Sequence, residues 1–345
     1  MEQPSGAVQS QEQRVADFVN AFHTLRNEVR KVIVGHDEVI THVLIGLFAG
    51  GHVLLEGVPG LGKTLLIRTL AESLDLSFSR IQFTPDLMPG DIIGTNIIVE
   101  DPSGRKHFEF QRGPIFGHIL LADEVNRATP KTQSALLEGM QEGSVTVSGA
   151  ANPLPSPFFV LATQNPIEME GTYPLPEAQL DRFLFKLRVR YPALEELTEI
   201  IERTTHVREV QVQRVMTGPQ VLAFRELVRE TPIASHVRDL ASLIVLSTHP
   251  QWERAPEPAR RFVRYGASPR GAQALVLGAK VRALAEGRYN VSVEDLKAVA
   301  LPALRHRLIL NFEGEAEGVD VDRLIGELVD TAQSMSISQK EVFLR

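Results

Sequence analysis

The sequence predicts an α/β domain with a five-stranded parallel sheet flanked by helices, followed by an all-helical domain. Two observations predict this fold class. Up to residue 192, short apolar runs alternate with segments of helical periodicity, and some of these runs are apolar almost throughout. Strands buried on both faces of a parallel sheet have this composition, because helices cover both sides of the sheet. After residue 192, apolar residues recur at helical spacing and no strong strand signal remains.

Five apolar runs are the predicted strands of the sheet. The third and the fourth are nearly continuous apolar stretches, as expected for strands that are buried on both faces. In chain order the runs are HVLLEG (52–57), FSRIQF (78–83), HILLADE (118–124), FFVLATQN (158–165) and FLFKLRVRY (183–191).

The second domain is predicted from five segments with helical periodicity, at 197–205, 220–230, 237–249, 271–287 and 293–308. We therefore divide the chain into four parts. Residues 1–14 are polar and small and are predicted to be disordered. Residues 15–192 form the α/β core, 193–332 the helical domain, and 333–345 a weakly patterned C-terminal tail.

Composition excludes several classes of protein. The chain has 345 residues, a net charge of −7 and no cysteine, which rules out disulfides, thiolate metal sites and cysteine nucleophiles. An acidic chain has no bulk attraction for nucleic acid, so nucleic acid is an unlikely partner. The N-terminus lacks the pattern of a signal peptide. The most apolar window, 39–55, is interrupted at His42 and at Gly50-Gly51, so we expect no membrane span and a cytoplasmic location.

A phosphate-binding loop is predicted at residues 57–64, which are GVPGLGKT. The glycines allow the backbone to turn its N–H groups towards a phosphate, and the following helix adds a positive N-terminus. Lys63 would reach the β- and γ-phosphates, and the Thr64 hydroxyl would bind Mg²⁺. The alternative is a chance glycine turn with a surface lysine. The predicted nucleotide-binding residues of this segment are Gly57, Val58, Pro59, Gly60, Leu61, Gly62, Lys63, Thr64 and Leu65.

Two acids follow the apolar residues 119–122 at the carboxyl end of the third predicted strand. Ligands bind at this edge of an open α/β sheet. Asp123 would hold Mg²⁺, directly or through water, and Glu124 would orient or deprotonate an attacking water. The alternative is that Asp123 caps the next turn and Glu124 is solvated.

Asn165 and Arg270 are further candidates. The fourth strand ends in ATQNP, which places Asn165 beside the acids, where its amide could hold a water or touch a phosphate. An Asx turn leading into Pro166 is equally consistent with this segment. In GASPRGAQ, Ser268 is the predicted N-cap of a helix. Arg270 then lies in the first turn, where a bound anion would offset the unfavourable helix dipole. A solvated arginine is the alternative.

Arg182 lies near the end of the segment LPEAQLDRF (175–183). Its sequence neighbours leave two possibilities open. It could pair with Asp181 or Glu177 in its own chain, or it could meet a negative charge elsewhere.

The chain resembles the MoxR family of AAA+ ATPases over residues 15–330. The resemblance rests on VGHDEVI, GVPGLGKT, RIQFTPDLMPGDIIGT, GPIFGHILLADEVNRATPKTQSALLEGMQEGSVTV, PFFVLATQNPIEMEGTYPLPEAQLDRF and GASPRGAQALVLGAK. One departure is His36, where the family often has glutamine.

The resemblance implies a role for each of these positions. GVPGLGKT is the Walker A loop and Asp123-Glu124 is Walker B. Asn165 resembles sensor 1, Arg270 sensor 2, and Arg182 the arginine finger that reaches the ATP site of the next subunit. The backbone of Val34 and Gly35 would contact adenine. The implied catalytic residues are Glu124, Lys63, Asn165, Arg182 and Arg270, and the implied metal ligands are Thr64 and Asp123.

The resemblance also implies a ring, usually a hexamer, that hydrolyses ATP with Mg²⁺ and remodels or matures a protein partner. Relatives commonly work with proteins that carry a von Willebrand factor A domain. Two inserts are predicted, a hairpin at 96–110 and a short strand with a loop at 143–158. In relatives such elements lie at the pore or face of the ring. A helicase-type nucleic-acid motor and a nucleotide-gated scaffold with slow hydrolysis are the two alternatives.

Overall fold

The computed structural model describes residues 10–166, 172–206 and 210–343. Its core is a parallel sheet of five strands in the order β2-β5-β8-β1-β9. Each strand lies within one of the five predicted runs, so the α/β prediction is confirmed. The strands are β1 (Val53–Glu56), β2 (Phe78–Gln82), β5 (Ile119–Asp123), β8 (Phe159–Gln164) and β9 (Phe185–Arg188).

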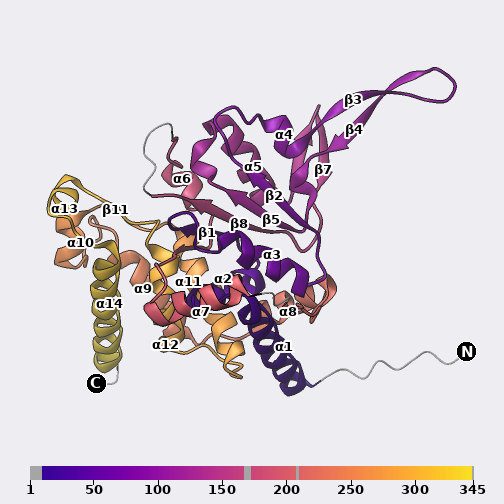
Figure 1. Ribbon diagram of the computed structural model, residues 1–345. Helices are drawn as coiled ribbons and strands as arrows, with labels where there is room; N and C mark the ends of the chain where they lie inside the picture. Colours follow the sequence, from indigo (N-terminus) through magenta and orange to yellow (C-terminus); the bar gives the residue numbers. More distant parts are fainter. Residues whose placement is uncertain (1–9, 167–171, 207–209, 344–345) are drawn as a thin grey trace, which may run out of the picture.

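Helices cover both faces of the sheet (Figure 1). Successive side chains of a strand point to opposite faces, so Val53 and Leu55 join one apolar core while Leu54 joins the other. The first core contains side chains of α1 (Gln11–Val32), α2 (Asp37–Ala49) and α3 (Lys63–Ser73). The second contains side chains of α4 (Pro89–Ile93) and α5 (Pro130–Glu142). This burial on both faces is the reason for the continuous apolar runs.

The N-terminal boundary differs from the prediction. Helix α1 begins at Gln11, so residues 11–14 are helical and not disordered. Ser10 caps the helix by accepting a hydrogen bond from the backbone N–H of Gln13 at 3.3 Å. One turn further on, Val15 and Phe18 are buried in the core, which holds the first turn in place. The first nine residues of the predicted disordered segment lie outside the described residues.

Both inserts contain two-stranded hairpins. The first consists of β3 (Gly94–Glu100) and β4 (Lys106–Arg112), and it extends well away from the body of the molecule (Figure 1). Asp101 closes its turn by accepting hydrogen bonds from the backbone N–H groups of Ser103 and Arg105. The second consists of β6 (Ser144–Val147) and β7 (Ala150–Pro153), where the sequence had indicated one short strand and a loop.

The second domain is helical, as predicted, with one exception. A two-stranded antiparallel pair, β10 (Val263–Tyr265) and β11 (Ile309–Leu310), lies within it and is too short to leave a sequence signal. The helices are α7 (Leu194–Thr205), α8 (Gly218–Glu230), α9 (Ser235–Ser247), α10 (Glu257–Phe262), α11 (Pro269–Ala285), α12 (Val293–Leu304), α13 (Phe312–Ala316) and α14 (Val321–Phe343).

Helix α14 continues through the predicted boundary at residue 332. No glycine or proline lies between residues 327 and 343 to stop it, so the predicted tail is largely the end of this helix.

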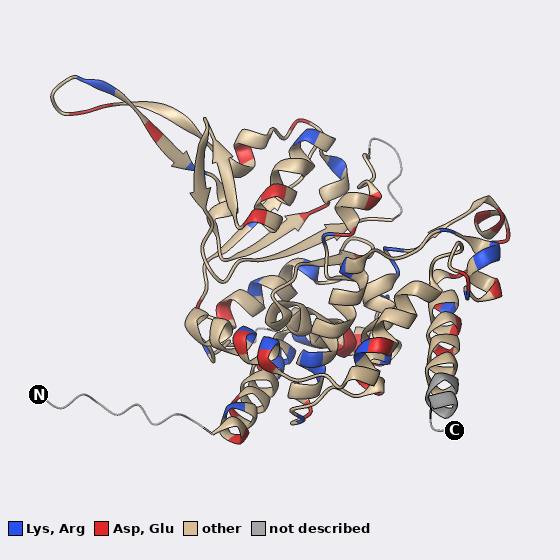
Figure 2. Ribbon diagram, turned by 180° about the vertical axis from the view of Figure 1, so that it is seen from behind, with Lys and Arg blue, Asp and Glu red and all other residues tan. Residues whose placement is uncertain are grey.

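The helical domain packs against the core and is not held by a linker alone. Helix α11 lies against both α1 and α2. Its Gly278 lies so close to the core strand β9 that a Cβ atom there would come within 2.7 Å of the Phe185 ring. None of the described helices is both long and apolar enough to cross a membrane. Seen from behind, Lys and Arg are interspersed with Asp and Glu over these helices (Figure 2).

Candidate functional site

The loop between β1 and α3 has the backbone that its glycines predict. Gly60 and Gly62 have φ angles of +84° and +74°, in the left-handed region that favours glycine. Gly57 is required for a different reason, because a Cβ atom there would lie 3.1 Å from the carbonyl oxygen of Val189. Helix α3 begins at Lys63, and its N-cap Gly62 has no side chain with which to cap the first turn. The helix N-terminus is therefore available to an anion.

Lys63 folds back over this loop. Its Nζ donates a hydrogen bond of 2.5 Å to the carbonyl oxygen of Gly57. Burial lowers the pKa of Lys63, whereas the nearby charges of Asp123 and Glu124 raise it. The lysine therefore lies within electrostatic reach of both predicted acids.

Asp123 is the last residue of β5, and its side chain is held by neighbouring strands. Thr163 on β8 donates from Oγ1 to Asp123 Oδ1 at 2.7 Å. Arg80 on β2 donates from a terminal nitrogen to Asp123 Oδ2, also at 2.7 Å. These contacts show that Asp123 is a buried carboxylate bound to strands on either side rather than the cap of the following turn.

Glu124 leaves the strand in a left-handed conformation, with φ of +57°. Its N–H donates to Thr163 Oγ1 at 2.8 Å, so one threonine hydroxyl joins both acids. Its carboxylate accepts a hydrogen bond of 2.7 Å from the side-chain amide of Gln82 and lies 3.2 Å from the Arg127 guanidinium. Glu124 is therefore held in place and is not simply solvated.

Asn165 directly follows β8 and is buried. Because β8 pairs with β5, Asn165 lies at the same edge of the sheet as the two acids. The sheet order thus brings together the three polar side chains that the sequence placed at strand ends.

A pocket of about 460 Å³ lies beside the phosphate loop. The predicted residues Val34, Pro59, Gly60, Leu61, Gly62 and Leu65 line it. The rest of its wall was not predicted and comes from His36, the segment after β9 and helix α7, with Tyr191, Leu197, Ile200 and Arg203 among the lining residues. Gly35 lies behind this wall, where a Cβ atom would come within 2.4 Å of the Glu196 carboxylate.

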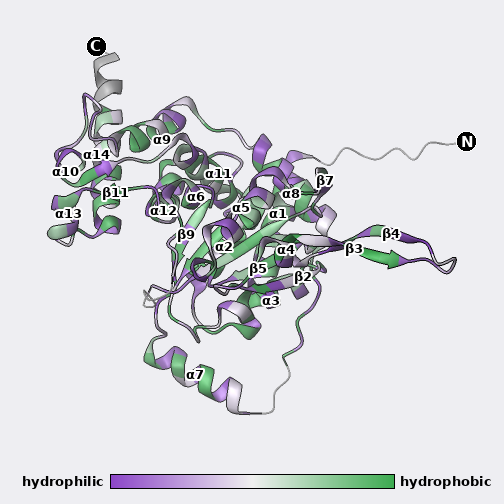
Figure 3. Cartoon of the chain, turned by 90° about the horizontal axis from the view of Figure 1, so that it is seen from above, coloured by the Kyte–Doolittle hydropathy of each residue, from purple (hydrophilic) through white to green (hydrophobic). Residues whose placement is uncertain are grey.

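Helix α7 lies apart from the other helices of its domain (Figure 3). It contains no buried residue, and it is held at its end by Arg203, which donates to the carbonyl oxygen of Lys31 at 2.8 Å. The sequence assigned this helix to the second domain. The apolar residues at positions 197 and 200 indicated that one face of this helix packs against another segment. The sequence does not show that this segment is the phosphate loop.

Arg182 donates a hydrogen bond of 2.9 Å to the carbonyl oxygen of Leu137 on α5. Among the described residues it forms no ion pair with Asp181 or Glu177, so the intrachain pair is not what the structure shows. Asp181 instead contacts the helical domain. It accepts hydrogen bonds from Ser268 at 2.8 and 2.9 Å and from Arg307 at 2.8 Å, and it lies 3.8 Å from the Arg270 guanidinium.

Arg270 therefore lies at the C-terminal end of α6 (Glu177–Leu180). The residue that it meets there, Asp181, is next to Arg182 in the chain. The two predicted arginines belong to one region of the surface. The contacts that place Arg270 there are with Asp181 and Ser268, because its backbone N–H also donates to the Ser268 hydroxyl.

Comparisons with known proteins agree with this arrangement. The model of the ATPase family associated with various cellular activities (AAA) matches residues 52–185, and that of the AAA lid domain matches residues 258–328. The chaperone MoxR1 of Mycobacterium tuberculosis is 44% identical over 90% of this chain and 82% of its own length. The protein MoxR of Methylorubrum extorquens is 33% identical over 86% of this chain and 90% of its own. The chain belongs to the MoxR family of AAA+ ATPases.

The fold of this MoxR-family chain also matches a solved structure. A candidate ATPase of Cytophaga hutchinsonii is 43% identical and superposes with a TM-score of 0.86, over 92% of this chain and 96% of that one. Family membership implies nucleotide binding, and the phosphate loop with its adjoining pocket is where the MoxR fold offers it.

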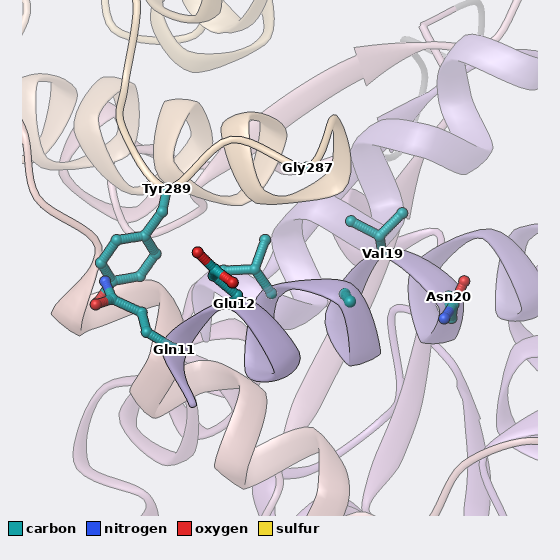
Figure 4. Close-up of a pocket in the computed structure, with 8 residues that line it drawn as sticks. Gln11, Glu12, Val19, Asn20, Gly287 and Tyr289 are labelled. Atoms are coloured by element: carbon teal, nitrogen blue, oxygen red, sulfur yellow. The ribbon is translucent and has the colours of Figure 1, made fainter. Parts of the chain in front are cut away.

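A separate cavity of about 500 Å³ lies between α1 and the turn that follows α11. Gln11, Glu12, Val19 and Asn20 of α1 lie beside Gly287 and Tyr289 of that turn (Figure 4). None of the residues predicted to bind nucleotide lines this cavity. The MoxR-family phosphate loop therefore opens into the pocket beside α7 and not into this one.

Replacing Ile200 with aspartate is expected to weaken nucleotide binding about tenfold, because it introduces a charge into the apolar wall of the pocket beside α7. A fluorescent ATP analogue would measure the change in Kd. The matched control is Ile201→Asp, on the adjacent position that is 53% exposed, where the affinity should stay within twofold. Equal affinities for both variants would show that α7 does not contact the nucleotide.

Proposed function

We propose that this chain hydrolyses ATP within an oligomeric ring and couples hydrolysis to the remodelling or maturation of a protein partner. The observation that carries the proposal is the arrangement at one edge of the sheet, where Lys63 follows the phosphate loop after β1 and Asp123 and Glu124 lie at the carboxyl end of β5. A lysine from the phosphate loop after β1 and two acids at the carboxyl end of β5 are the groups that hydrolysis of a nucleoside triphosphate requires.

The residues present fit a nucleoside triphosphate. The left-handed Gly60 and Gly62 shape a loop that ends at an uncapped helix N-terminus, which suits a phosphate chain. The apolar pocket beside α7 suits a base and ribose, with Val34 on one side and Leu197 on the other.

The residues also fit magnesium that arrives with the nucleotide. Among the residues that the structure describes, no three His, Asp or Glu side chains form a metal site of their own. Mg²⁺ bound to phosphates takes only one or two protein oxygens. The Thr64 hydroxyl and Asp123 carboxylate would supply these, and the metal would neutralise phosphate charge.

The remaining steps belong to the side chains of the chain itself. Lys63 offsets negative charge on the terminal phosphates. Glu124, fixed through Thr163 and Gln82, accepts the proton of the attacking water. The Asn165 amide holds that water or a phosphate oxygen.

In this proposal Arg182 completes the ATP site of a neighbouring subunit, and Arg270 contacts a phosphate as sensor 2. Arg270 lies at the junction of α6 with the helical domain, which Asp181 ties together, whereas Arg182 directly follows Asp181 in the chain and contacts α5. A cation supplied across a subunit boundary stabilises the charge that develops in the transition state. A ring, with six subunits as the expected number, makes each ATP site depend on the next subunit.

The partner is proposed to be a protein. The name of the Mycobacterium tuberculosis relative, chaperone MoxR1, supports protein clients. A protein with a von Willebrand factor A domain is the partner that the family resemblance implies. Along the ribbon of the helical domain, Lys and Arg are mixed with Asp and Glu (Figure 2), a pattern that favours a protein partner over nucleic acid.

A mixing experiment tests the shared site. Lys63→Ala removes the phosphate contact and leaves Arg182 intact, whereas Arg182→Ala does the reverse. We expect each variant alone to be nearly inactive as an ATPase, and an equimolar mixture to regain a measurable fraction of the wild-type rate. The recovery would come from subunits in which an intact site faces an intact arginine.

Arg323→Ala is the matched control, because this arginine is 82% exposed on α14 and should leave the ATPase rate unchanged. Co-assembly of the two variants is checked by pull-down of a tagged subunit. A co-assembled mixture without activity would overturn the proposal that Arg182 acts across a subunit boundary.

A further inference from the structure

Strand β2 presents two polar side chains to the acids of the neighbouring strand. Arg80 and Gln82 are two residues apart and so lie on the same face of the sheet. The Arg80 guanidinium donates to Asp123 Oδ2 at 2.7 Å and to Gln82 Oε1 at 2.8 Å. Neither residue has a role in the site as predicted from the sequence.

Arg80 occupies one of the two oxygens of the carboxylate that is proposed to hold magnesium. Thr163 already donates to Oδ1 of Asp123, so Oδ2 is the oxygen bound to a positive charge. The Asp123 side chain is 12% exposed, and a carboxylate this buried requires a compensating partner. Arg80 provides that partner.

The two partners differ in how freely they can move. The Arg80 side chain is 47% exposed and lies on β2, the edge strand of the sheet. Its long stem can turn to solvent while the head group remains hydrated. Asp123 is fixed by Thr163 and by the strand, so Arg80 is the partner that can leave.

We propose that Arg80 pairs with Asp123 Oδ2 as a placeholder cation and leaves this oxygen when the magnesium nucleotide binds. Arg80 thereby sets the Mg²⁺ concentration at which the site becomes occupied. The inference rests on the proposed function of Asp123 as the metal carboxylate. Two cations at one carboxylate repel each other, and a divalent ion bound beside phosphates is the stronger competitor. Arg80 is a positioning residue in this account and takes no part in the reaction.

The test is a magnesium titration of nucleotide binding. Binding of a fluorescent, non-hydrolysable ATP analogue is followed as Mg²⁺ is added to wild type and to Arg80→Gln, which keeps a hydrogen-bond donor but removes the charge. We expect the variant to reach half-maximal Mg²⁺-dependent binding at about one-tenth of the wild-type Mg²⁺ concentration. Arg80→Lys retains the charge and should stay within about twofold of wild type.

A matched control separates this effect from a change in net charge. Arg68→Gln removes an exposed arginine on α3 that pairs with Glu72, and its Mg²⁺ midpoint should equal that of wild type. Arg80→Met provides a second charge-removing side chain in case the glutamine variant folds poorly, and it should show the same shift. Circular dichroism checks the fold of each variant.

Each outcome decides the question. A midpoint in the Arg80 variants that equals the wild-type value, or that rises, would overturn the placeholder role and leave the proposed ATP site intact. Nucleotide binding by wild type that is independent of Mg²⁺ would overturn the placeholder role of Arg80 together with the metal role of Asp123, whereas ATP hydrolysis in a ring is tested separately by the mixing experiment. A lower midpoint in Arg80→Gln and Arg80→Met, with Arg80→Lys unchanged, supports the inference.

Discussion

Replacing Glu124 with glutamine is expected to slow ATP hydrolysis at least 100-fold while nucleotide binding is retained. The amide keeps the shape of the side chain and its contact with Gln82, but it cannot accept a proton from water. Because the backbone N–H of Glu124 still binds Thr163, the position of Asp123 should not change. Phosphate release and the Kd of an ATP analogue measure the two quantities separately.

Glu138→Gln serves as the control, since Glu138 is exposed on α5 and the substitution makes the same change in charge. A Glu124→Gln variant that hydrolyses ATP at the wild-type rate would exclude Glu124 as the base. A variant that fails to hydrolyse yet still supports the partner process would indicate a nucleotide-gated scaffold in place of a motor.

The second large effect is expected on stability. Replacing Asp181 with alanine should lower the free energy of unfolding by about 3 kcal/mol or more. This is the usual cost of removing one partner of a buried ion pair and leaving the other charge buried. The Arg307 side chain is 2% exposed, and burial lowers the pKa of Arg307 while Asp181 raises it. Without Asp181, this guanidinium stays buried with only carbonyl partners such as that of Phe183. Urea unfolding followed by circular dichroism measures the change.

Glu177→Ala is the matched control for Asp181. Glu177 lines a cavity of about 460 Å³ together with Asp181 and Arg307, separate from the pocket beside α7. It is exposed, so its loss should cost less than about 1 kcal/mol. A loss of similar size in both variants would contradict the view that the buried pair joins α6 to the helical domain.

The strands and the acids at their ends could be predicted from the sequence because burial on both faces leaves a continuous apolar run. Asp123 and Asn165 each end such a run, and the parallel sheet brings strand ends to one edge. The turn of the first hairpin was equally accessible, since Asp101 makes its hydrogen bonds to residues only two and four positions away. Interactions between residues this close together in the chain can be predicted from the sequence.

The parts that sequence could not supply depend on contacts between distant segments. Arg80 meets Asp123 only because β2 lies beside β5, and that pairing follows from the order of strands in the sheet. Ile200 lines the pocket beside the phosphate loop because the chain returns over that loop after β9. Arg270 meets Asp181 across the two domains. In each case the residue type was visible in the sequence but its partner was not.

The apolar core on the α1 side of the sheet has a consequence for how the molecule moves. Side chains of strands β1 and β9 and of helices α8, α9, α11, α12 and α14 belong to one continuous core, so the change from strands to helices near residue 192 does not divide it. Separating the two parts would expose that shared interior to water. We therefore expect the two parts to move as one rigid body and to unfold in one cooperative transition. Helix α7 has no residue in this core. Helix α7 can therefore move without exposing the apolar core to water. We expect the opening and closing of the pocket beside the phosphate loop to be confined to movement of this helix.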